Sequence, residues 1–310
     1  MIWLFVFLRA VANPLSNVFQ KVLTRRSAAP LVVICVTHGL LSAVCLPALW
    51  LLSPAVRAGF WPNILLCAAL AVAGNTLLVE ALRMSDLSVL GPVNAYKAAV
   101  SLVPAAVLLG EAPGPAGLAG IGLIVAGSYA LVDRGAGRAG PRGRSAVARF
   151  ATDRGIQFRL AALVLSAVEA VFLKRALLAS APVVTFAYWA VLGFGMSAAA
   201  LGAGALAAGA AFTLRVRGPR DSHAAGGPGG LSASAGPYLL LGLTTGLMQL
   251  CTLLTFQSLQ VGYALALFQT STLLTVVLGY KVFREPHFAR RMAGSAVMVA
   301  GAVLIVCTRG

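Results

Sequence analysis

The chain of 310 residues is 59% hydrophobic and only 10% charged, with a mean hydropathy of +0.90 and a formal net charge of +16. Soluble domains have about a quarter of their residues charged, so this composition excludes a soluble protein and indicates an integral membrane protein. The apolar runs are about 20 residues long, as in membrane-spanning helices, whereas a membrane barrel would show alternating segments of about ten residues. The sequence therefore predicts an all-α integral membrane protein.

Ten transmembrane helices are predicted along the chain. Each covers one apolar run, and together they occupy residues 2–20, 30–52, 61–82, 86–108, 114–132, 159–178, 181–203, 237–258, 262–283 and 290–307. The first run has no basic segment before it and no small-residue cleavage site, which predicts a retained span and not a signal peptide. Two connecting segments differ from the rest: residues 133–158 are rich in Arg, and residues 215–236 resemble a flexible Gly- and Ser-rich loop.

An internal repeat relates the two halves, with an offset of 174 residues from Leu108 onward and a three-residue slip upstream, where Ala81-Leu82-Arg83 matches Ser258-Leu259-Gln260. The run Leu108-Leu109-Gly110-Glu111 corresponds to Val282-Phe283-Arg284-Glu285, and the following helices share glycines at equivalent places. Such a repeat indicates a duplicated architecture. Because each copy holds an odd number of spans, the second copy must enter the membrane in the opposite sense. We expect two inverted five-helix repeats over 1–132 and 159–310, joined by a basic linker over 133–158.

The repeated residues have structural interpretations. Gly120 and Gly127 are seven residues apart, as are Gly294 and Gly301, so each pair lies on one helix face where another helix can approach closely. Glu111 and its counterpart Glu285 precede helix starts marked by proline. A carboxylate there offsets unpaired amides, which favours a capping role over a transport role.

The net charge of +16 is explained better by membrane orientation than by nucleic-acid binding. The loops after the first, third, fifth, seventh and ninth spans hold 18 of the 24 basic residues, and the opposite loops hold four. Lys and Arg concentrate in cytoplasmic loops, so the central linker is predicted to be cytoplasmic and both termini to be outside. No basic groove with interleaved aromatic residues is present, so no nucleic-acid partner is expected.

Motifs for metal, cofactor or enzymatic chemistry are lacking in the sequence. The five cysteines lie in apolar spans or at their ends without a CxxC or Cys/His pair, so they are predicted to pack, with no metal site and no disulfide framework. The hydrolase motif GxSxG, the phosphate-binding motif GxxxxGK[ST] and the Rossmann glycine pattern do not occur. We therefore expect no catalytic residue, no cofactor and no enzyme.

Polar side chains within the predicted spans are the candidate binding residues. An ionisable group in hydrocarbon costs at least about 2.5 kcal/mol and usually faces a cavity. Arg9, Asn13 and Asn17 recur every four residues and therefore share one helix face, beside Pro14, which frees a backbone carbonyl. With polar residues of later spans, the candidate set is Arg9, Asn13, Asn17, Glu80, Asn94, Lys97, Glu169, Gln249 and Gln269.

We expect these residues to line a cavity near the membrane midplane. Glu169 or Glu80 would carry a proton, because a buried carboxyl group can exchange protons near physiological pH. Arg9 and Lys97 would hold an anionic part of a substrate, or pair with the carboxylates when the site is empty. The alternative is that these groups only join helices, for example through ion pairs of Arg9 with Glu80 and Lys97 with Glu169.

These features together resemble the drug/metabolite transporter (DMT) superfamily, EamA type. The resemblance rests on the two five-span repeats, each with a hydrophobic-Gly/Arg-Glu turn before a glycine-marked helix, and on the runs 81–85 and 91–97 that lead to Gly110-Glu111. It implies a ten-helix secondary transporter of a small organic metabolite in the cell (inner or plasma) membrane. Alternating access would be coupled to protons or to exchange.

Several alternatives stay open at this level. Members of that superfamily usually keep both termini in the cytoplasm, against the charge count, so orientation is undecided. The chain could instead be a non-transporting multispanning protein, either a scaffold or an intramembrane enzyme. The expected partners are a small-molecule substrate and the lipid bilayer, and a homo-oligomer is neither predicted nor excluded.

Overall fold

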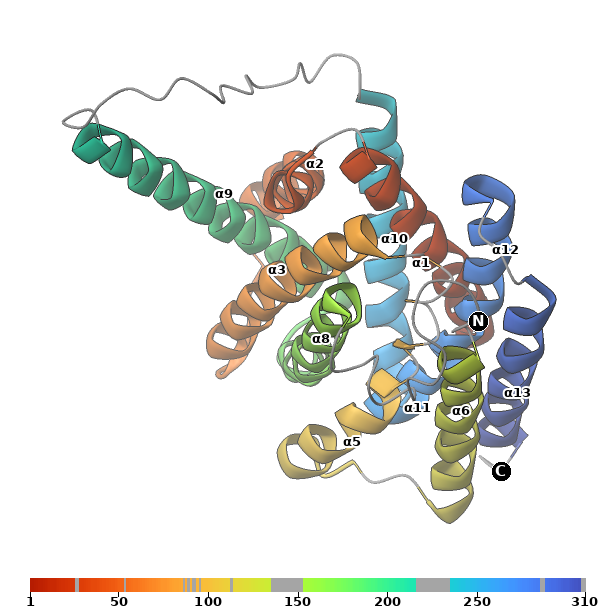
Figure 1. Cartoon of the computed structure of the whole chain (residues 1–310). Coiled ribbons are helices and arrows are strands. Elements are labelled where there is room, and N and C mark those ends of the chain that lie inside the picture. The colour runs from red at the N-terminus through yellow and green to blue at the C-terminus, as the bar shows by residue number, and fades with distance from the viewer. Residues whose placement is uncertain are drawn as a thin grey trace.

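The computed structural model describes residues 1–25, 28–52, 54–85, 87, 90, 93–94, 96–111, 114–134, 153–215, 235–284 and 288–307. Within these ranges all regular secondary structure is helical, and the helices form one bundle (Figure 1). They are α1 (Ile2–Arg25), α2 (Pro30–Leu52), α3 (Phe60–Met84), α5 (Tyr96–Leu109), α6 (Pro115–Arg134), α8 (Arg154–Leu178), α9 (Pro182–Arg215), α10 (Ala235–Ser258), α11 (Val261–Leu267), the 3-10 turn η2 (Phe268–Thr270), α12 (Ser271–Phe283) and α13 (Phe288–Cys307).

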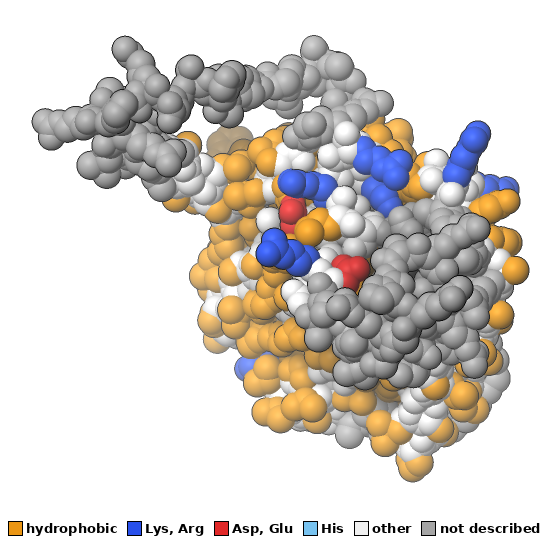
Figure 2. Space-filling view, in the orientation of Figure 1, with side chains coloured by type: hydrophobic (Ala, Val, Ile, Leu, Met, Phe, Trp, Pro, Cys, Tyr) orange, Lys and Arg blue, Asp and Glu red, His pale blue; other side chains and the backbone are white. Residues whose placement is uncertain are grey.

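Seven helices of the described chain are long and apolar enough to cross a membrane, when α11, η2 and α12 are taken as one segment from Val261 to Phe283. Three shorter apolar helices accompany them, formed by Tyr96–Leu109, Pro115–Gly127 and Met292–Gly301. The predicted span 86–108 is therefore helical in α5 only from Tyr96 onward. Large hydrophobic side chains are exposed on most of these helices, as Figure 2 shows for one face. The protein is a multi-pass membrane protein.

The two halves of the chain are interleaved. The most extensive contacts are those of α3 with α8, α1 with α10, α6 with α13 and α2 with α9. Each of them joins a helix of the first half to a helix of the second half. The polar residues of α1 and α8 can therefore approach one another, although they are far apart in sequence.

The repeated glycines lie where α6 packs against α13. A Cβ atom added to Gly127 would lie 3.1 Å from the carbonyl oxygen of Gly294, and one added to Gly301 would lie 2.6 Å from the carbonyl oxygen of Gly120. Gly127 thus lies opposite Gly294 and Gly120 opposite Gly301, which shows that the two helices are antiparallel. The structure confirms the prediction that the four glycines lie at a helix interface.

The sequence predicted that Glu111 caps the helix that follows it, but its partners in the structure belong to the other half of the chain. Its carboxylate instead accepts a hydrogen bond of 2.7 Å from the backbone N–H of Val261, at the start of α11, and forms an ion pair of 2.5 Å with Lys174 of α8. The carboxylate thus stabilises a helix start of the other half of the chain. The predicted cap at Glu285 and most of the basic linker lie outside the described residues.

Candidate functional site

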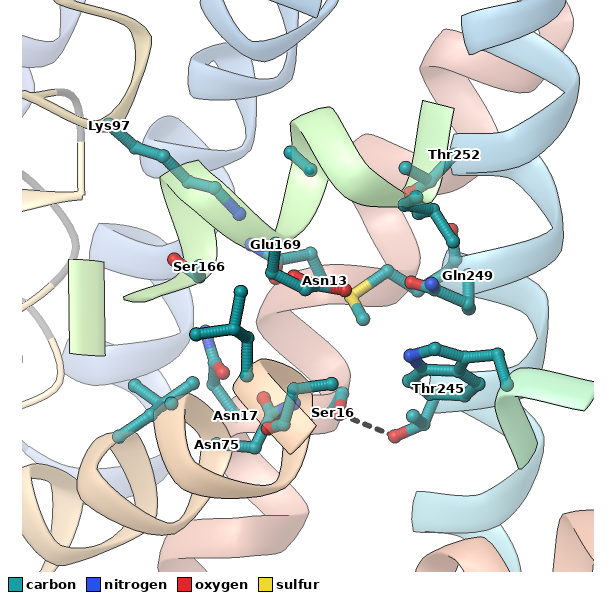
Figure 3. Close-up of a pocket in the computed structure, with 18 of the residues that line it drawn as sticks. Asn13, Ser16, Asn17, Asn75, Lys97, Ser166, Glu169, Thr245, Gln249 and Thr252 are labelled. Atoms are coloured by element: carbon teal, nitrogen blue, oxygen red, sulfur yellow. Dashed lines mark hydrogen bonds between the residues drawn. The ribbon is translucent and has the colours of Figure 1, made fainter. Parts of the chain in front are cut away.

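A cavity of about 100 Å³ lies where helices of the two halves meet. It holds space for several water molecules, since one water needs about 10–15 Å³ on this measure. Helices α1, α3, α8 and α10 form most of its wall, and Figure 3 shows their polar side chains pointing toward one another. The charged residues in the wall are Arg9, Lys97, Arg159 and Glu169.

Helix α1 places a row of polar side chains along this cavity. Arg9, Asn13 and Asn17 line it, as the spacing of four residues predicted, and Ser16 and Gln20 extend the row. The amide of Asn13 donates to Ser271 Oγ at 3.4 Å, and the hydroxyls of Ser16 and Thr245 are 2.9 Å apart (Figure 3). These two contacts connect α1 to α12 and to α10.

Glu169 lies on α8 and is only 9% exposed. Cys67 donates its thiol hydrogen to Oε1 of Glu169 at a sulfur–oxygen distance of 3.8 Å. Lys97 and Arg9 are the basic groups that interact electrostatically with this carboxylate. Glu169 is the only carboxylate among the described residues that line the cavity.

The two arginines of the cavity, Arg9 and Arg159, have different contact partners. The Arg9 guanidinium lies 4.1 Å from the centre of the Phe268 ring, a cation–π contact, and its Nε donates to Thr252 Oγ1 at 3.4 Å. Arg159 Nε donates to the carbonyl oxygen of Leu90 at 3.3 Å. Both residues are less than a tenth exposed.

Seven of the nine predicted site residues line the cavity, and two do not. Glu80 forms an ion pair of 3.6 Å with Arg83, a half-exposed residue on the same helix, so the suggested pair with Arg9 is replaced by a local one. Gln269 lies behind the wall, where its Oε1 accepts a hydrogen bond of 3.4 Å from Asn94. The seven lining residues are Arg9, Asn13, Asn17, Asn94, Lys97, Glu169 and Gln249.

Several residues that line the cavity were absent from the predicted set, among them Arg159, His38 and Trp189. Arg159 was the first residue of a predicted span and was counted with the charges of the basic linker, but α8 begins at Arg154 and brings Arg159 into the buried part of the helix. His38 and Trp189 are single polar groups in apolar spans, and their rings pack at 4.5 Å between centres. No signal in the sequence distinguishes them from core residues.

Unpaired polar atoms are concentrated in the cavity wall. Five buried side-chain atoms there have no hydrogen-bond partner among the described residues: Arg9 Nη1, Gln20 Oε1, His38 Nδ1, Trp189 Nε1 and Gln249 Nε2. Buried polar atoms in proteins are nearly always paired with protein groups or water. This wall therefore has free donors and acceptors for a polar ligand or for water.

Comparisons with known proteins agree with this description. The sequence model of the EamA-like transporter family matches residues 1–132. A solved crystal structure at 17% sequence identity superposes with a TM-score of 0.64, over 97% of this chain and 94% of that chain, which shows a shared fold. In all, 28 solved chains match this protein, and no curated protein matches it.

Proposed function

From the match of residues 1–132 to the sequence model of the EamA-like transporter family, we propose that the protein is a secondary transporter of the DMT superfamily. It moves a small organic metabolite across the cell membrane by alternating access. The observation that carries this proposal is the cavity with charged and unpaired polar groups between the two halves of the chain. Soluble substrates need such a site to cross hydrocarbon.

The proposed architecture is ten spans in two inverted repeats, 1–132 and 159–310, with the linker 133–158 between them. In chain order α1, α2, α3 and α6 then correspond to α8, α9, α10 and α13. The contact of α3 with α8 has its equivalent in the contact of α10 with α1, while α2–α9 and α6–α13 each join a helix to its own counterpart. A two-fold relation between the repeats produces this pattern.

Two lysine contacts give independent support to the inverted repeat. Lys21 of α1 donates to the carbonyl oxygen of Ser85 at 3.1 Å, and Lys174 of α8 donates to the carbonyl oxygen of Leu259 at 2.7 Å. Ser85 and Leu259 are the first residues after α3 and α10, and Lys21 and Lys174 each lie four residues before the last residue of their helix. A lysine of α1 thus binds the end of α3, and a lysine at the matching place of α8 binds the end of α10.

The same lysine positions suggest how access alternates. Lys174, the Glu111 carboxylate and the start of α11 join the two halves beyond one end of α8. Rocking of one repeat against the other would break contacts at one end of the cavity while contacts at the opposite end form. Glu169 is the proposed proton carrier, because it is the buried carboxylate of the described cavity wall.

The alternatives are a scaffold and an intramembrane enzyme. A scaffold needs no cavity with five unpaired polar atoms, since apolar packing would hold its helices at lower cost. Members of the EamA-like family are transporters, which also disfavours an enzyme. Transport therefore explains the wall of the cavity best.

Transport is tested with purified protein in liposomes under an imposed proton gradient. Compounds that raise the melting temperature in a screen of sugars, amino acids, nucleobases and organic acids are offered as substrates, since bound ligands stabilise the folded state. Glu169→Gln should abolish proton-driven uptake while the protein still folds, and Glu80→Gln, outside the cavity, should transport normally. Normal uptake by both variants would remove Glu169 from the mechanism, and absence of uptake by any compound would contradict transport itself.

A further inference from the structure

The cavity wall has more positive charge than its carboxylate can balance. Three basic side chains, Arg9, Lys97 and Arg159, line it together with Glu169. Arginine keeps its proton in proteins, so two positive charges stay in the wall whatever the protonation of Lys97. One carboxylate can balance only one of them. At least one buried positive charge therefore lacks a counter-charge among the described lining residues.

The arrangement of these cations adds to the imbalance. Lys97 is repelled by both Arg9 and Arg159, and Glu169 is the carboxylate that attracts it. Glu80, which could have balanced Arg9, pairs with Arg83 instead. Unpaired charges buried in a low-dielectric interior are strongly unfavourable, so proteins keep them where a ligand or function requires them.

The wall also presents donors without acceptors. Arg9 Nη1 and Gln249 Nε2 are buried, belong to residues that are 7% and 5% exposed, and find no acceptor within the described part of the chain. Both are donors, as an anion requires. Trp189 and Phe256 line the same cavity and give an organic group an apolar surface to pack on.

On the basis of the proposed transport function, we infer that the substrate is a small organic anion whose carboxylate or phosphate group binds beside Arg9 and Lys97. Gln249 donates to the same ligand, and Arg159 contributes positive charge from the α8 side. The anion supplies the missing counter-charge and accepts the unpaired hydrogen bonds. The inference adds substrate class to the proposed function and depends on it.

The test compares anions with their neutral isosteres by the melting temperature of the purified full-length protein. Lactate, malate and glycerol 3-phosphate are measured beside lactamide, malamide and glycerol, with choline as the cation and with sodium chloride as the ionic-strength control. At least one organic anion should raise the melting temperature by several degrees more than its neutral counterpart. Arg9→Gln should lose this shift, while Arg83→Gln, which changes an arginine outside the cavity, should keep it.

Lys97→Met provides a readout that needs no ligand. If Lys97 is an excess cation of the cavity wall, this variant should melt about 2 °C or more above the unchanged protein when no anion is present, and should lose the anion-induced shift. If Lys97 serves only as an ion-pair partner of Glu169, the variant should melt lower. That result would overturn the inference even if Arg9→Gln failed to fold.

The outcomes separate substrate class from transport. Stabilisation and uptake of neutral or cationic compounds, with none for anions, would overturn the anion and leave the transporter in place. Equal anion shifts in Arg9→Gln and the unchanged protein would show surface binding only and would also overturn it. Absence of binding and uptake in every class would contradict both proposals.

Discussion

Gly110 and Arg284 take the same rare backbone conformation at the ends of two different helices. Their φ angles are +66° and +54°, in the left-handed region. Gly110 follows α5 and Arg284 follows α12, and the two positions are equivalent in the 174-residue repeat. Glycine adopts this conformation without strain, whereas a residue with a Cβ atom is destabilised by about 1–2 kcal/mol. The first repeat thus has glycine, which fits the left-handed conformation, whereas the second repeat has an arginine that is strained there.

Exchange of the residue types at these positions should have opposite effects. Gly110→Ala should lower the melting temperature, and because nothing lies within 4 Å of the added Cβ, the loss reports backbone strain alone. Arg284→Gly should raise it, and Arg284→Ala, which removes the charge but keeps a Cβ, should leave it nearly unchanged. A shift of about 2–4 °C per kcal/mol is expected in thermal unfolding. A higher melting temperature for Gly110→Ala would contradict the assigned conformation.

At the scale of elements, α6 and α13 approach each other closely because of their glycines. Gly301→Ala brings a Cβ within 2.6 Å of a backbone oxygen, which forces the helices apart. The melting temperature should therefore fall by several degrees. Gly122→Ala on α6 is the matched control, since its Cβ meets nothing within 4 Å, and alanine is the better helix former by about 1 kcal/mol. Equal losses for both variants would show that the glycine interface is unimportant.

A second element-scale contact connects Glu111, Lys174 and the start of α11. Both side chains of the ion pair are largely buried, so Glu111→Gln leaves Lys174 uncompensated and should destabilise the protein by about 3 kcal/mol. The double variant Glu111→Gln with Lys174→Met should recover much of this loss, because the unpaired cation is gone. A double-mutant cycle of unfolding free energies measures the coupling. Additive effects would mean that the two groups do not stabilise each other.

For the whole molecule, the distribution of charge predicts the orientation. On the face in Figure 2, Lys and Arg gather toward one end of the molecule. Among the described residues six basic side chains are exposed, and five of them, Arg25, Arg83, Arg154, Lys281 and Arg284, belong to the side that the charge count assigns to the cytoplasm, while Arg57 belongs to the opposite side. We propose that this end faces the cytoplasm, which places both termini outside.

Cysteine labelling in intact cells decides the orientation. Ser145→Cys, in the basic linker, should not react with a membrane-impermeant maleimide, whereas Ala58→Cys, in the exposed loop between α2 and α3, should react. The unsubstituted protein gives the background of the native cysteines. The reverse labelling pattern would support cytoplasmic termini, as the superfamily resemblance implies.

The hydrophobic periodicity and the repeat determined which residues form helices. They also determined which helix face carries polar residues and which carries the interface glycines. Arg9, Asn13 and Asn17 were found on one face because helix geometry depends only on spacing along the chain, and the interface glycines were found for the same reason. The rule that polar groups avoid hydrocarbon predicted seven residues that line the cavity. These are local properties that the sequence expresses directly.

Only the tertiary structure decided which helices face one another. Glu80 and Glu169 look alike in the sequence, yet Glu80 pairs with Arg83 outside the cavity and Glu169 lies among three cations inside it. Arg159 stood at the end of a predicted span and was counted with the linker charges, whereas α8 places it in the cavity wall. Glu111 caps a helix of the other half of the chain. The reason is physical: the burial and charge of a side chain depend on neighbours distant in the chain, and the packing of the helices selects those neighbours.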